Sequence, residues 1–144
     1  MQTSQYFNLG DETLWNPSNG AARLFLGQLV VFEAELELPG GIGPMENDEC
    51  QVEPVAFAVF ASALLAWHRR ARHAVVLVLS EGFVTTVLAL AERAAVDLDW
   101  AEPGVAAQGE RDVQVPVPPD LVDHGRARRQ LRERVREISR AMPR

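Results

Sequence analysis

Glu81 is the residue whose type and setting most directly indicate chemistry. Leu77 and Val84 stand near it at helical spacing, which predicts a carboxylate on an apolar helix face. Burying a carboxylate without a partner is costly, so the sequence predicts a buried ion pair between Glu81 and Arg23, a cation among the apolar residues of another predicted helix. A Glu81 that keeps its proton in the bundle core could instead act as a general acid or base beside His68 or Arg23.

Carboxylates also gather in and before the loop 39–53. The set comprises Glu33, Glu35, Glu37, Glu46, Asp48 and Glu49. Oxygen ligands of this kind bind calcium or magnesium, but the spacing lacks the central glycine and the final glutamate of an EF-hand. We therefore predict that these six residues form a surface that binds a basic protein partner, and that they hold no metal.

Other reactive residues do not form a complete site. His68 and His73 are five residues apart, whereas zinc ligands on one helix favour a spacing of four, and Cys50 is the single cysteine. Ser80 lacks the glycine two residues before it that a nucleophile elbow needs, and the glycines of residues 40–44 do not lead from a strand into a helix. We assign no catalytic residue, no metal and no cofactor.

Charge is distributed unevenly along the chain. All 14 basic side chains are arginines, and eight of them lie in residues 126–144 against two glutamates, a balance of +6. Residues 1–125 hold six arginines against 18 acidic residues, a balance of −12. An acidic body argues against general nucleic-acid binding, and the basic end is expected to dock on the same chain or on a partner.

Hydrophobic spacing predicts about four helices. The first begins at Asn16 as the cap, with Pro17 in the first helical position, and ends at Pro39. The second begins near Pro54 and the third covers about residues 74–94, separated by a bend within residues 68–73, because one continuous helix would be too long for a domain of this size. The apolar third helix is expected at the centre of the fold.

The final helix is predicted to begin at Asp120. Its apolar seam consists of Leu131, Val135, Ile138 and Met142. Strand-like runs occur at residues 5–9 and 113–117 and could pair as a short two-stranded ribbon. The predicted fold is mostly α, a small helical bundle with this ribbon, organised as an acidic helical domain (1–125) and an arginine-rich C-terminal helix (126–144).

Residues 74–91 are the best candidate for a membrane span. They carry Glu81 near the middle, which is unfavourable at a bilayer centre, so we interpret this run as a buried helix of a soluble protein. A single cysteine cannot form an internal disulfide, and a cytoplasmic location is therefore expected.

Three segments together resemble a known family. They are residues 5–20, residues 41–50 and residues 81–84. They are similar to a family of small actinobacterial, Streptomyces-type proteins of unknown function, over roughly residues 4–95 and without the arginine-rich end. The resemblance implies no activity, and small acidic proteins of this type resemble immunity or accessory proteins.

These observations favour a non-enzymatic interaction protein, of immunity or accessory type, that recognises a basic protein through its acidic surface. The alternative is a small-molecule-binding protein or enzyme that uses Glu81 as a buried acid. The predicted partners include a second copy bound through the C-terminal helix, but neither a membrane nor, in the main interpretation, a nucleic acid.

Overall fold

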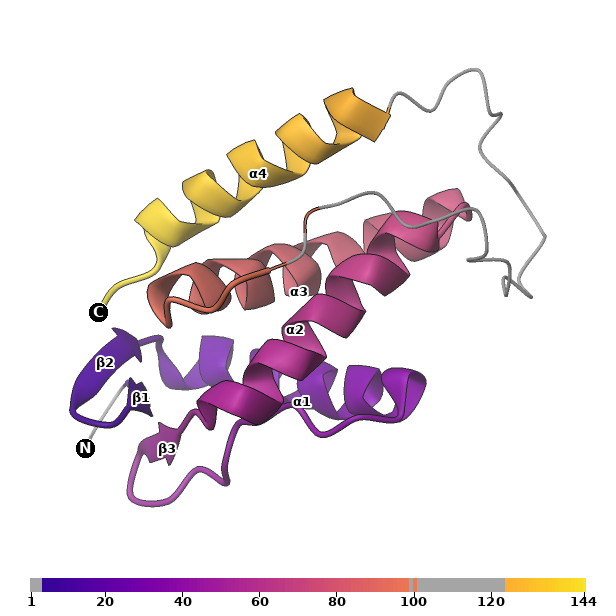
Figure 1. Ribbon diagram of the computed structural model, residues 1–144. Helices are drawn as coiled ribbons and strands as arrows, with labels where there is room; N and C mark the ends of the chain where they lie inside the picture. The colour runs from indigo at the N-terminus through magenta and orange to yellow at the C-terminus, as the bar shows by residue number, and fades with distance from the viewer. Residues whose placement is uncertain (1–3, 99, 101–123) are drawn as a thin grey trace.

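The computed structural model describes residues 4–98, 100 and 124–144, which form four helices and a three-stranded sheet (Figure 1). The helices are α1 (Asn19–Leu36), α2 (Pro54–Arg70), α3 (Ala74–Arg93) and α4 (His124–Ala141). The strands are β1 (Tyr6–Leu9), β2 (Glu12–Trp15) and β3 (Glu49–Gln51). The mostly helical class with a short β segment is as the sequence predicts.

The start of α1 differs from the prediction. Ser18, and not Asn16, is the N-cap, and its hydroxyl accepts a hydrogen bond from the backbone N–H of Ala21 at 3.2 Å. Residues up to Trp15 are taken by β2, so the helix begins at Asn19, after Pro17. A serine side chain satisfies a free N–H of the first turn as well as an asparagine does, and the local sequence offers both.

The break between α2 and α3 is confirmed. Pro54 occupies the first turn of α2, where the Glu53 carboxylate accepts a hydrogen bond from Ala56 N at 2.6 Å. Ala71 is extended and ends α2, and His73 caps α3 by accepting a hydrogen bond from Val76 N through Nδ1 at 3.4 Å. Polar side chains thus end one helix and begin the next, and α2 folds back beside α3.

The sheet has the order β2-β1-β3, with β1 antiparallel to β2 and parallel to β3. Both edges of β1 are therefore occupied by strands from the first 51 residues. Residues 113–117, the expected partner of β1, lie outside the described residues. The sequence-based argument missed β3 because three residues beside an acidic turn carry little alternation.

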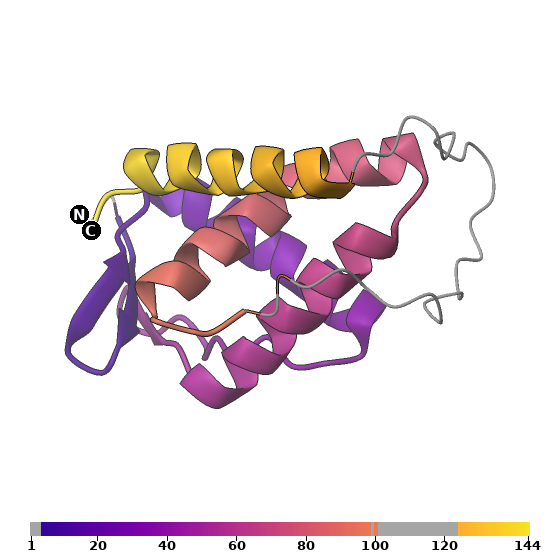
Figure 2. The ribbon, with the colours of Figure 1, turned by 45° about the horizontal axis from the view of Figure 1, so that its top comes forward.

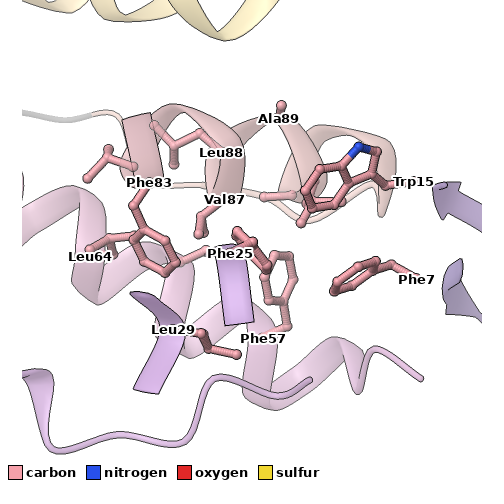
Figure 3. Packing of buried hydrophobic residues seen from close by; sticks show 14 of the residues in the cluster. Phe7, Trp15, Phe25, Leu29, Phe57, Leu64, Phe83, Val87, Leu88 and Ala89 are labelled. Atoms are coloured by element: carbon pink, nitrogen blue, oxygen red, sulfur yellow. The ribbon is translucent and has the colours of Figure 1, made fainter. Parts of the chain in front are cut away.

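Aromatic side chains join the sheet to the helices in one core (Figure 3). Phe7 packs on Trp15 with ring centroids 5.0 Å apart, and Trp15 meets Phe25 edge-on at 5.4 Å. Phe83 of α3 stacks on Phe25 at 5.3 Å and on Phe32 at 4.6 Å. Each such ring buries a large apolar area, so this chain of contacts fixes the sheet to α1 and α3.

α4 lies along α3 in both views of the ribbon (Figures 1 and 2). Its seam is confirmed: Leu131, Val135 and Met142 are buried and Ile138 packs against the core. The expected start at Asp120 lies outside the described residues. The apolar seam therefore packs the arginine-rich helix on the body of this chain.

α3 is central but not covered on all sides. It is the one helix of the described residues that is long and apolar enough to cross a membrane, and half of its most apolar window is buried in the fold. The C-terminal half packs against the other helices, whereas Val75, Val78 and Leu79 near its start are exposed. The buried half of α3 is thus the part that joins the core, and the exposed apolar side chains lie at its start.

Candidate functional site

The six carboxylates expected to form one surface are divided into two groups. Glu33, Glu35 and Glu37 lie at the C-terminal end of α1, whereas Glu46, Asp48 and Glu49 lie at β3. Figure 1 shows the end of α1 and β3 on opposite sides of the molecule, joined by residues 37–48. The sequence argument missed this separation because it treated the loop as a compact connection, while the loop returns along the length of α1.

Three of these acidic residues also form hydrogen bonds that hold the local backbone. The Glu33 carboxylate accepts a hydrogen bond from Gly40 N at 2.7 Å and so holds the loop that follows α1. Glu46 and Glu49 exchange backbone hydrogen bonds of 2.9 and 3.0 Å across a tight turn. The turn places Asn47 and Asp48 at positive φ, as a hairpin turn that suits a twisted sheet requires.

The second group is joined by acids that the sequence argument did not single out. Asp11 and Glu12 lie at the β1–β2 turn, and Glu53 follows β3. Residues 4–18 and 39–53 thus hold six carboxylates and no arginine or histidine. We call this set the acidic sheet rim; its members are Asp11, Glu12, Glu46, Asp48, Glu49 and Glu53.

The acidic sheet rim has a short span. Its strands contain three or four residues, so each is only about 10–13 Å long at about 3.3 Å per residue. This length exceeds the distance over which exposed charges act in physiological salt, about 8 Å, so the rim consists of two charge groups: Glu46, Asp48 and Glu49 at one end of the sheet, and Asp11, Glu12 and Glu53 at the other. Arg144 reaches Glu12 at 3.3 Å and is the one cation that forms a salt bridge with the rim among the described residues.

A groove of about 670 Å³ lies between the α2–α3 corner and α4. Its described lining contains five arginines and three glutamates: Arg69, Arg72, Arg126, Arg128, Arg134, Glu81, Glu133 and Glu137. Trp100 lies at its edge, and its carbonyl accepts a hydrogen bond from Arg69 Nη1 at 2.6 Å. The groove therefore combines an excess of guanidinium groups with an aromatic edge.

Glu81 lines this groove instead of the bundle core. Its carboxylate lies 3.3 Å from Arg134 of α4, and its side chain is 40% exposed. The predicted buried pair with Arg23 is therefore replaced by a surface pair, because Arg23 is an exposed residue of α1. Spacing within α3 located the apolar neighbours of Glu81 correctly, but only the docking of α4 decides which cation reaches it.

His68 is the most perturbed histidine of the described residues. Its Nδ1 is buried without a hydrogen-bond partner among them, in the wall of the same groove. Burial lowers the pKa of His68, and the negative charge of Glu81 opposes this effect. The structure thus brings His68 and Glu81 to one groove, as the alternative interpretation expected, but at the surface.

The remaining candidate ligands do not meet. Cys50 is buried in β3, and burial raises the pKa of its thiol to about 12. His73 serves as the cap of α3. Among the described residues, no group of three or more histidine, cysteine or acidic side chains could hold a metal ion.

A family model matches residues 3–144, described as a family of unknown function (DUF6086). The chain belongs to this family. Because the DUF6086 match runs through α4, the arginine-rich end is part of the family pattern, and the expectation that the likeness stops near residue 95 is wrong. No curated protein and no solved structure matches the chain.

Arg93 is a further residue of this DUF6086 chain that the sequence argument missed. Its guanidinium donates hydrogen bonds to Leu14 O at 2.6 Å, to Met142 O at 2.7 Å and to Ser139 O. It therefore ties β2 to the last turn of α4, where free carbonyls favour a cation. A single arginine at the end of an apolar helix gave no signal of this long-range role.

Proposed function

We propose that the protein is a non-enzymatic interaction protein that recognises a basic protein partner through the acidic sheet rim. The observation that carries the proposal is that the segments forming the sheet, residues 4–18 and 39–53, hold six carboxylates and no arginine or histidine. Glu46, Asp48 and Glu49 lie at one end of the sheet, and Asp11, Glu12 and Glu53 lie at the other. A concentrated field of one sign accelerates encounter with a partner of the opposite sign. The acids at the end of α1 are not counted in this surface; the Glu33 carboxylate instead binds Gly40 N, next to Gly41, whose carbonyl accepts a hydrogen bond from Glu53 N.

The proposal also covers the biological role of the protein and its cellular compartment. We include in it an immunity or accessory role in an actinobacterial cytoplasm, in which the acidic rim would recognise a basic partner. The buried thiol of Cys50, the one cysteine of the chain, agrees with a reducing compartment.

A charge-neutralising variant tests the proposal. The full chain and an E46Q/D48N/E49Q variant are each immobilised and exposed to lysate of the native organism, and captured proteins are identified by mass spectrometry. We expect a basic protein that binds the native chain at about 0.05 M salt, binds less at about 0.3 M, and is lost with the variant.

An E33Q/E35Q/E37Q variant is the matched control. It changes the net charge by the same amount, and glutamine at position 33 keeps an oxygen that can accept the Gly40 hydrogen bond. If both variants lose the partner equally, net charge and not the rim drives binding. If the rim variant retains the partner, the proposal is wrong.

A second candidate function is binding of an anionic small molecule in the groove beside α4. The observation that favours it is that five guanidinium groups, one of them Arg134 paired with Glu81, line one hollow with His68, against three glutamates. Guanidinium groups pair with phosphate and carboxylate groups in a bidentate manner. Nuclear magnetic resonance titration with inorganic phosphate and with citrate would test it: shifts confined to the groove would support this function, and their absence would reject it.

A further inference from the structure

The outer face of α1 is apolar and exposed. Leu24, Val30 and Val31 have exposed fractions of 67%, 64% and 64%, although α1 already buries Phe25 and Leu29 on its inner face. No charged residue occurs between Arg23 and Glu33 on any side of the helix. A surface helix normally presents polar residues outward, and contiguous exposed apolar side chains mark interaction sites.

The shape of this face agrees with a contact. A shallow hollow of about 550 Å³ lies along it, lined by Leu24, Val31, Gly20 and Gly27 together with the polar side chains of Arg23 and Gln28. A Cβ atom built on Gly27 would meet no atom of the described residues within 4 Å, so packing among these residues does not explain the glycine. Glycine in the middle of a helix costs about 0.5–1 kcal/mol relative to alanine, and its usual benefit is close approach of another backbone.

The charges at the two ends of α1 indicate what binds its outer face and in which direction the bound helix runs. Arg23 and Val30 are seven residues apart and lie on one flank of α1, with the cation near the start of the helix. The carboxylates Glu35 and Glu37 lie at the other end, Glu37 as the left-handed C-cap that follows Leu36. A second α1 running in the same direction would place like charges together. An antiparallel α1 places Arg23 of each copy beside the acidic end of the other.

The position of Gly27 determines which residues of the two antiparallel helices face each other. Seating Val30 or Val31 of one copy over Gly27 of the other brings Arg23 opposite residue 34 or 35 of the partner. Glu37 of the partner is then two or three residues away, about 3–4.5 Å along the axis. Arginine side chains on a helix lean toward its N-terminus, which is the direction of that carboxylate.

We propose that two copies of this chain associate through the outer faces of α1 in an antiparallel, two-fold symmetric pair. Such an interface is self-complementary, with each copy supplying the same patch. The two acidic sheet rims would lie at the far ends of the pair, since α1 begins at the sheet. The dimer uses a different face from the acidic sheet rim. The E33Q/E35Q/E37Q variant removes the Glu37 carboxylate of the dimer contact, whereas the E46Q/D48N/E49Q variant leaves the α1 face unchanged, so light scattering of the two variants separates loss of the dimer from loss of the rim.

The oligomeric state in solution tests the proposal. Light scattering after size-exclusion chromatography should give a mass near twice the 15.9 kDa of the chain, falling toward one chain on dilution. A G27Q variant should weaken association by about tenfold or more, because the longer side chain fills the hollow. The same variant should raise the melting temperature of the monomer, which excludes misfolding as the cause.

A charge exchange tests the direction of the helices. R23E and E37R should each weaken the dimer, and the double variant should restore it, since each cation again faces a carboxylate. The native chain remaining monomeric up to high micromolar concentration would overturn the proposal. So would a G27Q variant that dimerises as well as the native chain. A native monomer that sediments with phosphatidylcholine vesicles would also overturn it, and would assign the face to a membrane surface.

Discussion

Cys50 is held at a position where its chemistry is suppressed. Burial raises the pKa of the thiol to about 12, so almost no thiolate, the reactive form, exists near neutral pH. We expect iodoacetamide to label the native chain far more slowly than a free cysteine at pH 8, and the urea-unfolded chain at the normal rate. Rapid labelling of the native chain would show that β3 does not stay buried.

His68 gives the stability of the chain a pH dependence with a defined sign. Burial lowers its pKa, so below its ordinary value of about 6.5 the unfolded state binds more protons than the folded state. The free energy of unfolding should therefore fall as the pH decreases from 7 to 5. Urea titrations of a H68Q variant should show a shallower fall, and an identical pH profile for both proteins would contradict this account.

Glu81 and Arg134 form an exposed pair and should contribute little to stability. We expect E81Q to change the free energy of unfolding by less than about 1 kcal/mol, as for other surface ion pairs. The same change removes the charge that raises the pKa of His68, so the imidazole should titrate at lower pH. A pH titration of the His68 side-chain signals by two-dimensional nuclear magnetic resonance, in the native chain and in E81Q, measures this change in the pKa of His68.

Among the elements, α4 depends most on long-range contacts. Its polar face is rich in arginine, and its attachment rests on the apolar seam and on Arg93. An R93M variant leaves carbonyls of β2 and α4 without a charged donor. We expect it to lower the free energy of unfolding by about 1.5–3 kcal/mol in urea titrations.

Arg129 provides the matched control for this element. It is exposed on α4, so an R129M change removes the same charge without touching the contact with β2. A loss of stability as large as that of R93M would show that the charge of the helix, and not the clamp at its end, is what matters.

For the whole molecule, removing α4 should unfold or greatly destabilise the rest. A chain ending at Gly125 loses three buried apolar side chains, each of which contributes about 1.5–3 kcal/mol, and exposes the α3 surface that they cover. Thermal melts should show a clear drop in the melting temperature. An unchanged melting temperature would indicate that α4 does not pack on α3 of its own chain in solution.

Much of this fold could be predicted from the sequence, because helix ends and apolar helix faces depend on residues that are close together in the chain. The bend at residues 68–73, the start of α2 at Pro54 and the seam of α4 follow from helix length, proline geometry and a spacing of three and four residues. The three-stranded sheet did not follow, because the pairing of β1 with β3 joins residues more than 40 positions apart.

The candidate sites, like the fold, were predictable from the sequence only in part. The sequence by itself determined the charge of each segment, the apolar character of α3 and the residue types available for chemistry. Only the tertiary structure decided that Glu81 meets Arg134, that the acids of α1 and β3 lie apart, and that Arg93 reaches α4. The physical reason is that a side chain's partner depends on how distant elements pack, and helical spacing fixes which way a residue faces but not what it faces.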